Sequence, residues 1–449
     1  MDKQIQKKDK KILLQTSSSE AAGIPRKNPN LGKNSHEIIR FSSNGHDGVA
    51  FHPLGNTIAS SRNEDILLWD LKGSCQNILK GHKSQVCHVA FSFDGSILAS
   101  FSNHYANESL RLWSTSSGKP LGIPEEHYNV CSIAFSRDDK YIALGCSDST
   151  IRILKSPDWI HLRTLTGHKG QVGALVFSND GKYLYSGSHD CLLRVWETTG
   201  WICTMKKEYK HAVTCIAVSP KSEKIAVGIY PSTVYLRDAV TFKFLVKLRI
   251  PEEKYLPYMW SLAFSPDGKI IAGGFPHHVR LWNTETGGFI KVLKGDKGFV
   301  HSLTFSPVCE NKNKTILISC AQNGELHYWD LETYSLLVTN HQPDKGFLYS
   351  IPPDEYFQES LFWTDRADLI TVYAEKPDGK REVVSDKERD CYIDTHNRKL
   401  LVQARLCGDL KKYDDLAKGA QKVTESYNKQ SQIKYSIMIK ELPPRNNFE

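Results

Sequence analysis

The sequence lacks any run of about 18 or more apolar residues, so no membrane-spanning helix is expected. Residues 1–15 are rich in lysine and contain neither an apolar core nor a small-residue cleavage site, which argues against a Sec signal. The eleven cysteines are odd in number and form no CxxC pair, so neither a zinc knuckle nor a disulfide framework is predicted. These absences favour a protein of a reducing compartment, the cytoplasm or the nucleus.

Common catalytic motifs are also missing. There is no Gly-x-Ser-x-Gly elbow, Walker loop, HExxH helix, dinucleotide fingerprint or calcium loop. His277 and His278 are adjacent at the start of an expected strand, where neighbouring side chains point to opposite faces, so they do not form a paired metal site. We therefore expect a protein that is not an enzyme and that holds no cofactor and no metal.

Positive charge is unevenly distributed along the chain. The net charge is +8, and residues 1–44 contain nine Lys or Arg against four Asp or Glu, whereas residues 341–449 contain eighteen against nineteen. The middle of the chain is left with about +4, too little for a nucleic-acid groove. Residues 1–35, with a serine triplet and scattered proline and asparagine, are expected to form a flexible basic arm.

What the sequence does contain is a unit of about 42 residues that occurs seven times. Each unit has an apolar run, a turn like Phe-Ser-Pro-Asp-Gly, a run of small residues, and a run like Arg-Leu-Trp-Asp. A step of this length predicts one propeller blade per unit. The residues that lead into the turns are Phe51, Phe91, Phe135, Phe177, Val218, Phe264 and Phe305, and the positions of the Trp are filled by Trp69, Trp113, Leu154, Trp196, Arg237, Trp282 and Trp329.

The fourth unit is the fullest, with Gly167-His168, a Phe177 to Gly181 turn, Tyr185 to Asp190 and Arg194-Val195-Trp196-Glu197. On these motifs, residues 36–340 resemble the WD-repeat (WD40) family. The resemblance implies seven blades of four antiparallel strands closed into a ring. It also implies a buried, structural hydrogen-bond chain made of His168, Ser186, Asp190 and Trp196.

The other units keep less of this chain. Leu154 and Arg237 replace the Trp, and Pro231 and Pro276 stand in place of the turn Asp. We therefore expect the first, third, fifth, sixth and seventh units to depend more on apolar packing, while His82 keeps part of the chain in the second. Two segments compete to complete the last blade and close the ring, residues 36–41 and residues 335–340.

Residues 341–449 show no blade signature but are not of low complexity, so they should fold. Runs at 361–363, 369–373 and 381–384 predict strands, with a Pro-Asp-Gly turn at 377–379, and runs at 391–394 and 400–406 predict a further pair. Leu410, Tyr413, Leu416, Ala420, Val423 and Tyr427 fall on one helical face. The predicted fold is all-β, a seven-bladed β-propeller with a small C-terminal α+β appendage; an eighth blade is the alternative.

A rigid ring with a face of loops is suited to recognition. The resemblance implies that the binding face is formed by the loop leading into each unit and the turn before each Trp-bearing strand. The segment 252–260 is the strongest candidate because interface hot spots favour Trp and Tyr; the alternative is that Trp260 is a buried strand residue and that Tyr255 and Tyr258 pack on the C-terminal region. The candidate partner-binding residues are Arg62, His189, Tyr230, Phe275, Tyr255, Tyr258 and Trp260, and Lys206, Lys207, Lys210 and Lys297 favour an acidic or phosphorylated partner.

Three functions from different classes follow. The favoured one is a non-enzymatic scaffold that binds protein or peptide partners on the propeller face, as a monomer within a larger complex and without membrane insertion. The alternative is a substrate receptor or adaptor of a ubiquitin ligase, or a bacterial effector that acts as an adaptor; Trp69-Asp70-Leu71-Lys72 only loosely matches the family's adaptor-docking pattern. A lipid binder is disfavoured because the Phe-Arg-Arg-Gly signature of phosphoinositide-binding propellers is absent, and a nucleic-acid binder is disfavoured by the charge balance.

Overall fold

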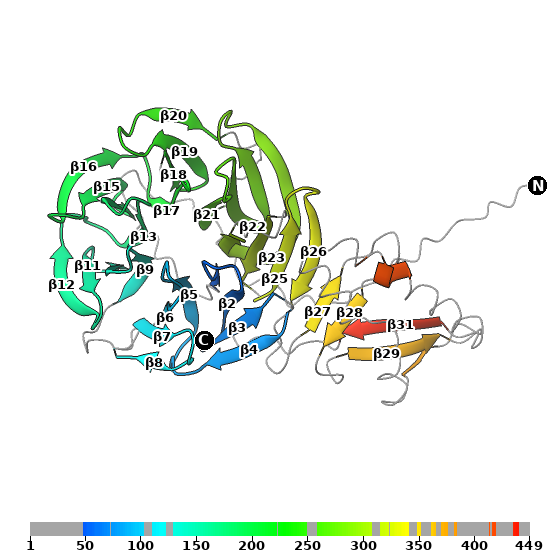
Figure 1. Cartoon of the computed structure of the whole chain (residues 1–449). Helices are drawn as coiled ribbons and strands as arrows, with labels where there is room; N and C mark the ends of the chain where they lie inside the picture. The colour runs from blue at the N-terminus through cyan, green and yellow to red at the C-terminus, as the bar shows by residue number, and fades with distance from the viewer. Residues whose placement is uncertain are drawn as a thin grey trace, which may run out of the picture.

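The computed structural model shows four-stranded antiparallel sheets arranged around a central axis as a β-propeller (Figure 1). It describes residues 48–340 except 72, 103–109, 123–128, 222, 249–257, 308–314 and 323, and beyond them residues 348–351, 361–364, 370–375, 381–383, 413, 415–418 and 434–439. The all-β propeller predicted from the sequence is confirmed.

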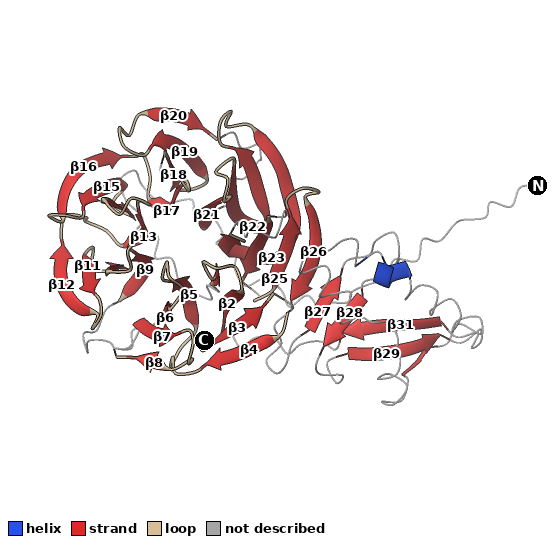
Figure 2. Cartoon of the chain, in the orientation of Figure 1, coloured by secondary structure: helices blue, strands red, loops and turns tan. Residues whose placement is uncertain are grey.

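Each of the first five units forms one sheet whose strands follow in chain order, and almost all of the described ring is strand and turn (Figure 2). These strands are β1 (Val49–Phe51), β2 (Thr57–Arg62), β3 (Asp65–Asp70) and β4 (Cys75–Leu79); β5 (Val86–Phe91), β6 (Ile97–Ser102), β7 (Leu110–Ser114) and β8 (Pro120–Leu121); β9 (Val130–Phe135), β10 (Tyr141–Cys146), β11 (Ile151–Lys155) and β12 (Ile160–Leu165); β13 (Val172–Phe177), β14 (Tyr183–Ser188), β15 (Leu192–Glu197) and β16 (Ile202–Glu208); β17 (Val213–Val218), β18 (Lys224–Ile229), β19 (Thr233–Asp238) and β20 (Phe244–Lys247).

The sixth and seventh units share one eight-stranded sheet. They are joined because one long strand, β23, pairs with β22 of the sixth unit and with β24 of the seventh. Its strands are β21 (Ser261–Phe264), β22 (Ile270–Asn283), β23 (Phe289–Phe305), β24 (Ile316–Ala321), β25 (Leu326–Asp330), β26 (Ser335–Asn340), β27 (Leu348–Ile351) and β28 (Leu361–Thr364). The sheets therefore number six over these seven sequence units, and the seven-blade count stays a prediction.

The turn between the first two strands of a unit explains why the Ser-x-Asp-Gly pattern recurs. In the fourth unit Ser178 Oγ donates to Asp180 Oδ1 at 2.5 Å, and Gly181 N donates to the Ser178 carbonyl at 2.9 Å. Gly181 has φ of 70°, which glycine adopts at little cost. The same serine-to-aspartate bond is made by Ser92 with Asp94 and by Ser265 with Asp267. This chemistry fixes the hairpin that starts each sheet.

The ring closes where the first unit meets the last. Ser302 Oγ in β23 bonds the backbone of Val49 in β1, with both Oγ···N and Oγ···O at 3.2 Å, and Phe51 N donates to Thr304 Oγ1 at 3.3 Å. Of the two candidate closing segments, 335–340 is the strand β26, paired with β25 in the last unit. The competing segment 36–41 lies outside the described residues.

Part of the C-terminal region is described. β27 pairs with the end of β26 and with β28, so the expected strand at 361–363 extends the last sheet. A separate sheet has the order β30 (Arg381–Val383), β29 (Ile370–Glu375) and β31 (Lys434–Ile439). Residues 413 and 415–418 are helical, within the predicted helix, whereas the expected strands at 391–394 and 400–406 lie outside the described residues. The appendage as a separate domain stays a prediction.

Candidate functional site

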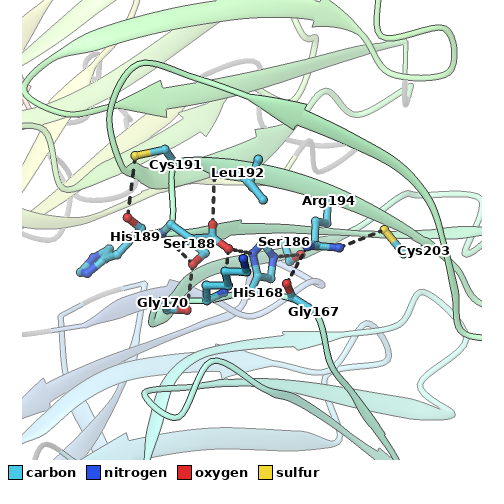
Figure 3. Close-up of polar contacts among 12 residues, drawn as sticks. Gly167, His168, Gly170, Ser186, Ser188, His189, Cys191, Leu192, Arg194 and Cys203 are labelled. Atoms are coloured by element: carbon cyan, nitrogen blue, oxygen red, sulfur yellow. Dashed lines mark hydrogen bonds and ion pairs between the residues drawn. The ribbon is translucent and has the colours of Figure 1, made fainter.

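A chain of buried hydrogen bonds runs through the fourth unit (Figure 3). Trp196 Nε1 donates to Ser186 Oγ at 2.8 Å, and Ser186 Oγ lies 2.8 Å from His168 Nε2. His168 Nδ1 lies 2.9 Å from Asp190 Oδ2. With the proton on Nδ1, His168 donates to the Asp190 carboxylate and accepts from the Ser186 hydroxyl at Nε2. The structure thus brings the four residues of the predicted chain together.

Asp190 is the negative end of this chain. Its carboxylate also accepts from the backbone N–H groups of Lys169 at 2.9 Å and Leu192 at 3.0 Å. Burial by itself would raise the pKa of Asp190, but the hydrogen bonds from His168 and from these amides outweigh burial and lower the pKa to about 2. This series of hydrogen bonds ties the loop leading into the unit to the turn before the Trp-bearing strand. Its role is therefore to hold these two loops in place.

Other units keep parts of the chain. His82 Nε2 lies 2.7 Å from Ser100 Oγ, which accepts from Trp113 Nε1 at 2.8 Å. The first and seventh units, expected to depend mainly on apolar packing, retain the serine-to-indole bond between Ser60 and Trp69 and between Ser319 and Trp329, both at 2.9 Å. In the seventh unit the buried carboxylate of Asp296 takes the place of the histidine and accepts from Ser319 Oγ at 3.0 Å. These two units therefore keep part of the polar chain beside their apolar packing, and which of the two contributes more stays a prediction.

We predict that Ser186→Ala destabilises the protein by about 2–3 kcal/mol, because it leaves the Trp196 indole N–H and His168 Nε2 buried without their partner. Urea unfolding followed by tryptophan fluorescence measures the change. Ser117→Ala, in an exposed turn, is the control and should change stability by less than about 0.5 kcal/mol. Equal stability of the two variants would contradict a structural role for the chain.

A row of aromatic side chains crosses the fifth, sixth and seventh units of the propeller. It lies at the loops that lead into the first strand of each unit. The ring centroids of Tyr230 and Tyr258 are 5.1 Å apart, those of Tyr258 and Trp260 are 6.2 Å apart, and those of Trp260 and His301 are 5.3 Å apart. The hydroxyl oxygens of Tyr230 and Tyr258 are 3.2 Å apart. The aromatic row consists of His211, Tyr230, Tyr258, Trp260, Phe299 and His301.

Members of the row come from segments far apart in the sequence. His211 precedes β17, Tyr230 follows β18, Tyr258 and Trp260 precede β21, and Phe299 lies in β23. His211 and Phe299 are exposed, while Tyr230, Tyr258 and Trp260 are half-buried. Trp260 is therefore not a fully buried strand residue, and the rings hold one another in place while keeping part of their surface open to solvent.

Phe275 does not belong to this surface, so that prediction was wrong. It is fully buried, lies parallel to the His278 ring at 5.5 Å, and packs in a core cluster with Trp282 and Met259. The reason is that β22 continues through the expected turn, which directs the Phe275 side chain into the core. Arg280, also buried, places its guanidinium 4.8 Å from the centre of the Phe275 ring.

The remaining candidates lie apart from the row. Arg62 is buried at the end of β2, so it offers little surface to a partner, and His189 is half-buried beside Asp190 in the fourth unit (Figure 3). Burial lowers the pKa of His189, which keeps its imidazole neutral. Tyr255 lies outside the described residues. The sequence also gave no sign of His211 and His301, because histidine at these places belongs to no part of the repeat pattern.

Basic residues recur in the loops that lead into the units. Lys83, Lys169 and Lys210 each stand three residues before the buried valine that starts a unit, and all three are exposed. Lys297 holds the same position before Val300. By contrast, Lys206 and Lys207 lie in the exposed outer strand β16 rather than in a leading loop, so they are not part of this face. Within the part of the chain that the structure describes, no cluster of metal-ligating side chains and no helix suited to crossing a membrane is found.

Comparison with known proteins finds a known repeat in about a third of the chain. The family described as "WD domain, G-beta repeat" matches residues 73–114, 118–154, 159–197 and 255–283. The chain is 24% identical over 226 residues to the transcriptional corepressor LEUNIG_HOMOLOG of Arabidopsis thaliana, covering 50% of this chain and 28% of that protein. It is 28% identical over 116 residues to the WD repeat and SOCS box-containing protein 1 of Danio rerio, covering 25% of each.

Solved structures agree on the fold. A chain of the mitotic checkpoint complex superposes with a TM-score of 0.54 at 20% identity, covering 64% of this chain and 89% of that one. The β-propeller domain of Cps50 (Swd1) from Myceliophteria thermophila superposes with a TM-score of 0.57 at 16% identity, covering 64% of this chain and 98% of that one. The chain spans less than a third of the length of the first curated relatives that it matches.

Proposed function

We propose that this chain, which carries WD repeats in a β-propeller, acts as a non-enzymatic scaffold that binds a peptide or protein segment on the aromatic row. The observation that carries this proposal is the row itself, in which half-exposed Tyr and Trp rings from two consecutive units lie in contact. Tyr and Trp dominate interface hot spots because each offers a large, rigid contact area together with a polar group.

Preorganisation supports the same site. The Tyr258 ring lies between those of Tyr230 and Trp260, so its rotamer is already restricted before any partner arrives. Binding then costs less side-chain entropy than it would on a flexible surface. Trp260 is itself contacted by the Phe299 ring, at 6.1 Å between centroids, and by the His301 ring. A preformed patch of this kind favours a partner segment with apolar or aromatic side chains.

The charge around the row favours a partner segment that also carries acidic residues. Lys210 is exposed beside His211 of the row. Asp296, three residues before Phe299, is buried, and Ser319 and His327 contact its carboxylate. Complementary charge mainly raises the rate of association, and this effect becomes weaker as the ionic strength rises.

An affinity purification from cell lysate tests the proposal. The intact chain is compared with the double variant Tyr258→Ala/Trp260→Ala, which removes hot-spot rings expected to contribute about 2 kcal/mol or more each and should reduce recovery of the partner at least about tenfold. The matched control is Phe244→Ala/Leu245→Ala, two exposed apolar residues on the outer strand β20. Circular dichroism establishes that all three fold. Equal recovery by the intact chain and the row variant would contradict the proposal.

The alternative, an adaptor or substrate receptor of a ubiquitin ligase, is favoured by one observation, the similarity to a WD repeat and SOCS box-containing protein. Against a docking role for the segment at 69–72, Trp69 is fully buried. The same purification distinguishes the two functions, because an adaptor would recover ligase subunits with both the intact chain and the row variant.

The proposal extends to the state of the protein in the cell. We propose a monomer within a larger complex, in a reducing compartment such as the cytoplasm or nucleus, where the described cysteines, all free thiols, stay reduced. Light scattering of the purified chain should give the monomer mass, and cell fractionation should place it in the cytosolic or nuclear fraction. A dimer, or recovery in the membrane fraction, would contradict this part of the proposal.

A further inference from the structure

One buried cluster joins three parts of the chain that are far apart in the sequence. It contains Trp69 and Val49 from the first unit, Cys320 and Tyr328 from the last, and Ala417 from the C-terminal region. We call it the seam cluster; its buried members are Val49, Ile58, Leu67, Trp69, Ile318, Cys320, Leu326, Tyr328, Leu337, Val338, Tyr413 and Ala417.

The C-terminal contribution is one face of a short helix. Tyr413 and Ala417 are 2% and 0% exposed, and Leu416 packs against the same cluster while half-buried. Asp415 and Lys418 are exposed. Residues three and four apart share a helix face, so this spacing puts the apolar side chains toward the ring and the charged ones toward solvent.

The seam differs from the other junctions between units. Consecutive units are joined directly by the chain, whereas the first and last units are joined only by non-covalent contacts, among them the bonds of Ser302 and Thr304 to β1. The C-terminal region is also attached next to the seam, because β27 pairs with the end of β26 through Thr339 with Ser350 and Asn340 with Tyr349.

From these contacts we infer that the junction between the first and last units is a docking surface for a short amphipathic helix, and that residues 413 and 415–418 of this chain occupy it. The helix shares one buried cluster with side chains of both units, so it fastens the ring where its first and last units meet. The C-terminal region then unfolds together with the ring. This inference is independent of the aromatic row, which shares no residue with the seam cluster.

Substitutions on the two faces of the same helix test the inference in the full chain. Ala417→Arg places a charge in the seam cluster, where burial without a partner is strongly unfavourable, and should lower Tm by at least about 5 °C. Asp415→Ala and Lys418→Ala change only exposed positions and should shift Tm by less than about 1 °C.

Hydrogen exchange then distinguishes loosening of the seam from a general loss of stability. In Ala417→Arg, exchange should accelerate about tenfold or more in residues 48–62 and 316–340, which flank the seam, and should be unchanged in residues 172–197 of the fourth unit. If Ala417→Arg does not yield soluble protein while both controls do, Leu416→Ala should give the same exchange pattern in milder form. Unchanged Tm and unchanged exchange at the seam would overturn the inference, as would uniform acceleration over all units.

Discussion

Gly145→Ala is expected to destabilise the ring by about 2–3 kcal/mol, although it adds only one methyl group. A Cβ at Gly145 would lie 2.5 Å from the backbone oxygen of Val172, the first residue of the next unit's inner strand, and would also collide with the Ser132 hydroxyl. That hydroxyl donates to the same Val172 oxygen at 3.0 Å. The methyl group must therefore separate two neighbouring sheets or break the bond that joins them.

The same place in the repeat is occupied by glycine in three further units. A Cβ at Gly187 would collide with Val213, one at Gly228 with the Cys215 and Met259 side chains, and one at Gly274 would lie 2.6 Å from the Val300 oxygen. In each case the obstruction includes a residue at the start of the next unit, which for Gly228 is Met259 just before β21. Close approach of neighbouring sheets thus depends on the missing side chain.

Gly173→Ala is the matched control for Gly145→Ala. The nearest atom to a Cβ at Gly173 is 3.9 Å away, in the His189 ring, and the residue is also in a strand. Alanine there should be neutral or stabilising by up to about 1 kcal/mol, because it reduces the freedom of the unfolded chain. Urea unfolding of both variants measures the difference; a Gly145→Ala protein as stable as Gly173→Ala would contradict this account of sheet packing.

Acidification from pH 7 to pH 5 is expected to cost about 4 kcal/mol of stability through two histidines of the second unit. Burial, together with the positive charge of Arg111, lowers the pKa of His82 to about 3, and burial lowers the pKa of His88 to about 4. Both imidazoles are therefore neutral in the folded state at pH 5. His88 lies parallel to Phe101, with ring centroids 5.7 Å apart.

The sign of the effect follows from the direction of these pKa shifts. In the unfolded chain both histidines have an ordinary pKa near 6.5, so below that pH the unfolded state binds protons that the folded state does not. Above pH 6.5 these two histidines cost the folded state no stability. Below it, the free energy of unfolding decreases as the pH falls toward their folded-state pKa values of about 4 and about 3. Each group contributes a slope of about 1.4 kcal/mol per pH unit within that window.

Two measurements check this prediction. NMR signals of the His82 and His88 rings should not titrate between pH 7 and pH 5, and urea unfolding should show the stability loss over the same range. His88→Phe keeps the stacking on Phe101 and removes one titrating group, so it should reduce the histidine-linked loss by about half. Ring signals that titrate with midpoints near pH 6.5, or an unchanged pH dependence in His88→Phe, would show that these groups are accessible to protons when folded.

The strands of the ring could be predicted from the sequence because their signals are local. The turns of the second, fourth and sixth units each carry Ser, Asp and Gly, and each unit repeats the apolar spacing, so the positions of β13, β14 and β15 follow from residues close to them. The strand β31 was missed, although Tyr435, Ile437 and Ile439 alternate with smaller or more flexible residues, because its partner β29 is about 60 residues away in the sequence.

The candidate site was predicted only in part, because the direction of a side chain depends on distant partners. Tyr258 and Trp260 were found from their composition, and the structure places them together with Tyr230. Phe275 was misplaced because β22 continues through its expected turn, and His301 was missed because its contact with Trp260 joins two units. The seam could not be predicted at all: Ala417 resembles any helical alanine until its surroundings are known.

The central claim, that the aromatic row binds the partner, is tested most directly by hydrogen exchange of the intact chain with and without its purified partner. The account predicts slower exchange in residues 209–213, 229–233, 258–261 and 298–301, which carry the row, and no change in the outer strands β12, β16 and β20. Protection confined to those outer strands or to the C-terminal region, with the row unchanged, would contradict it.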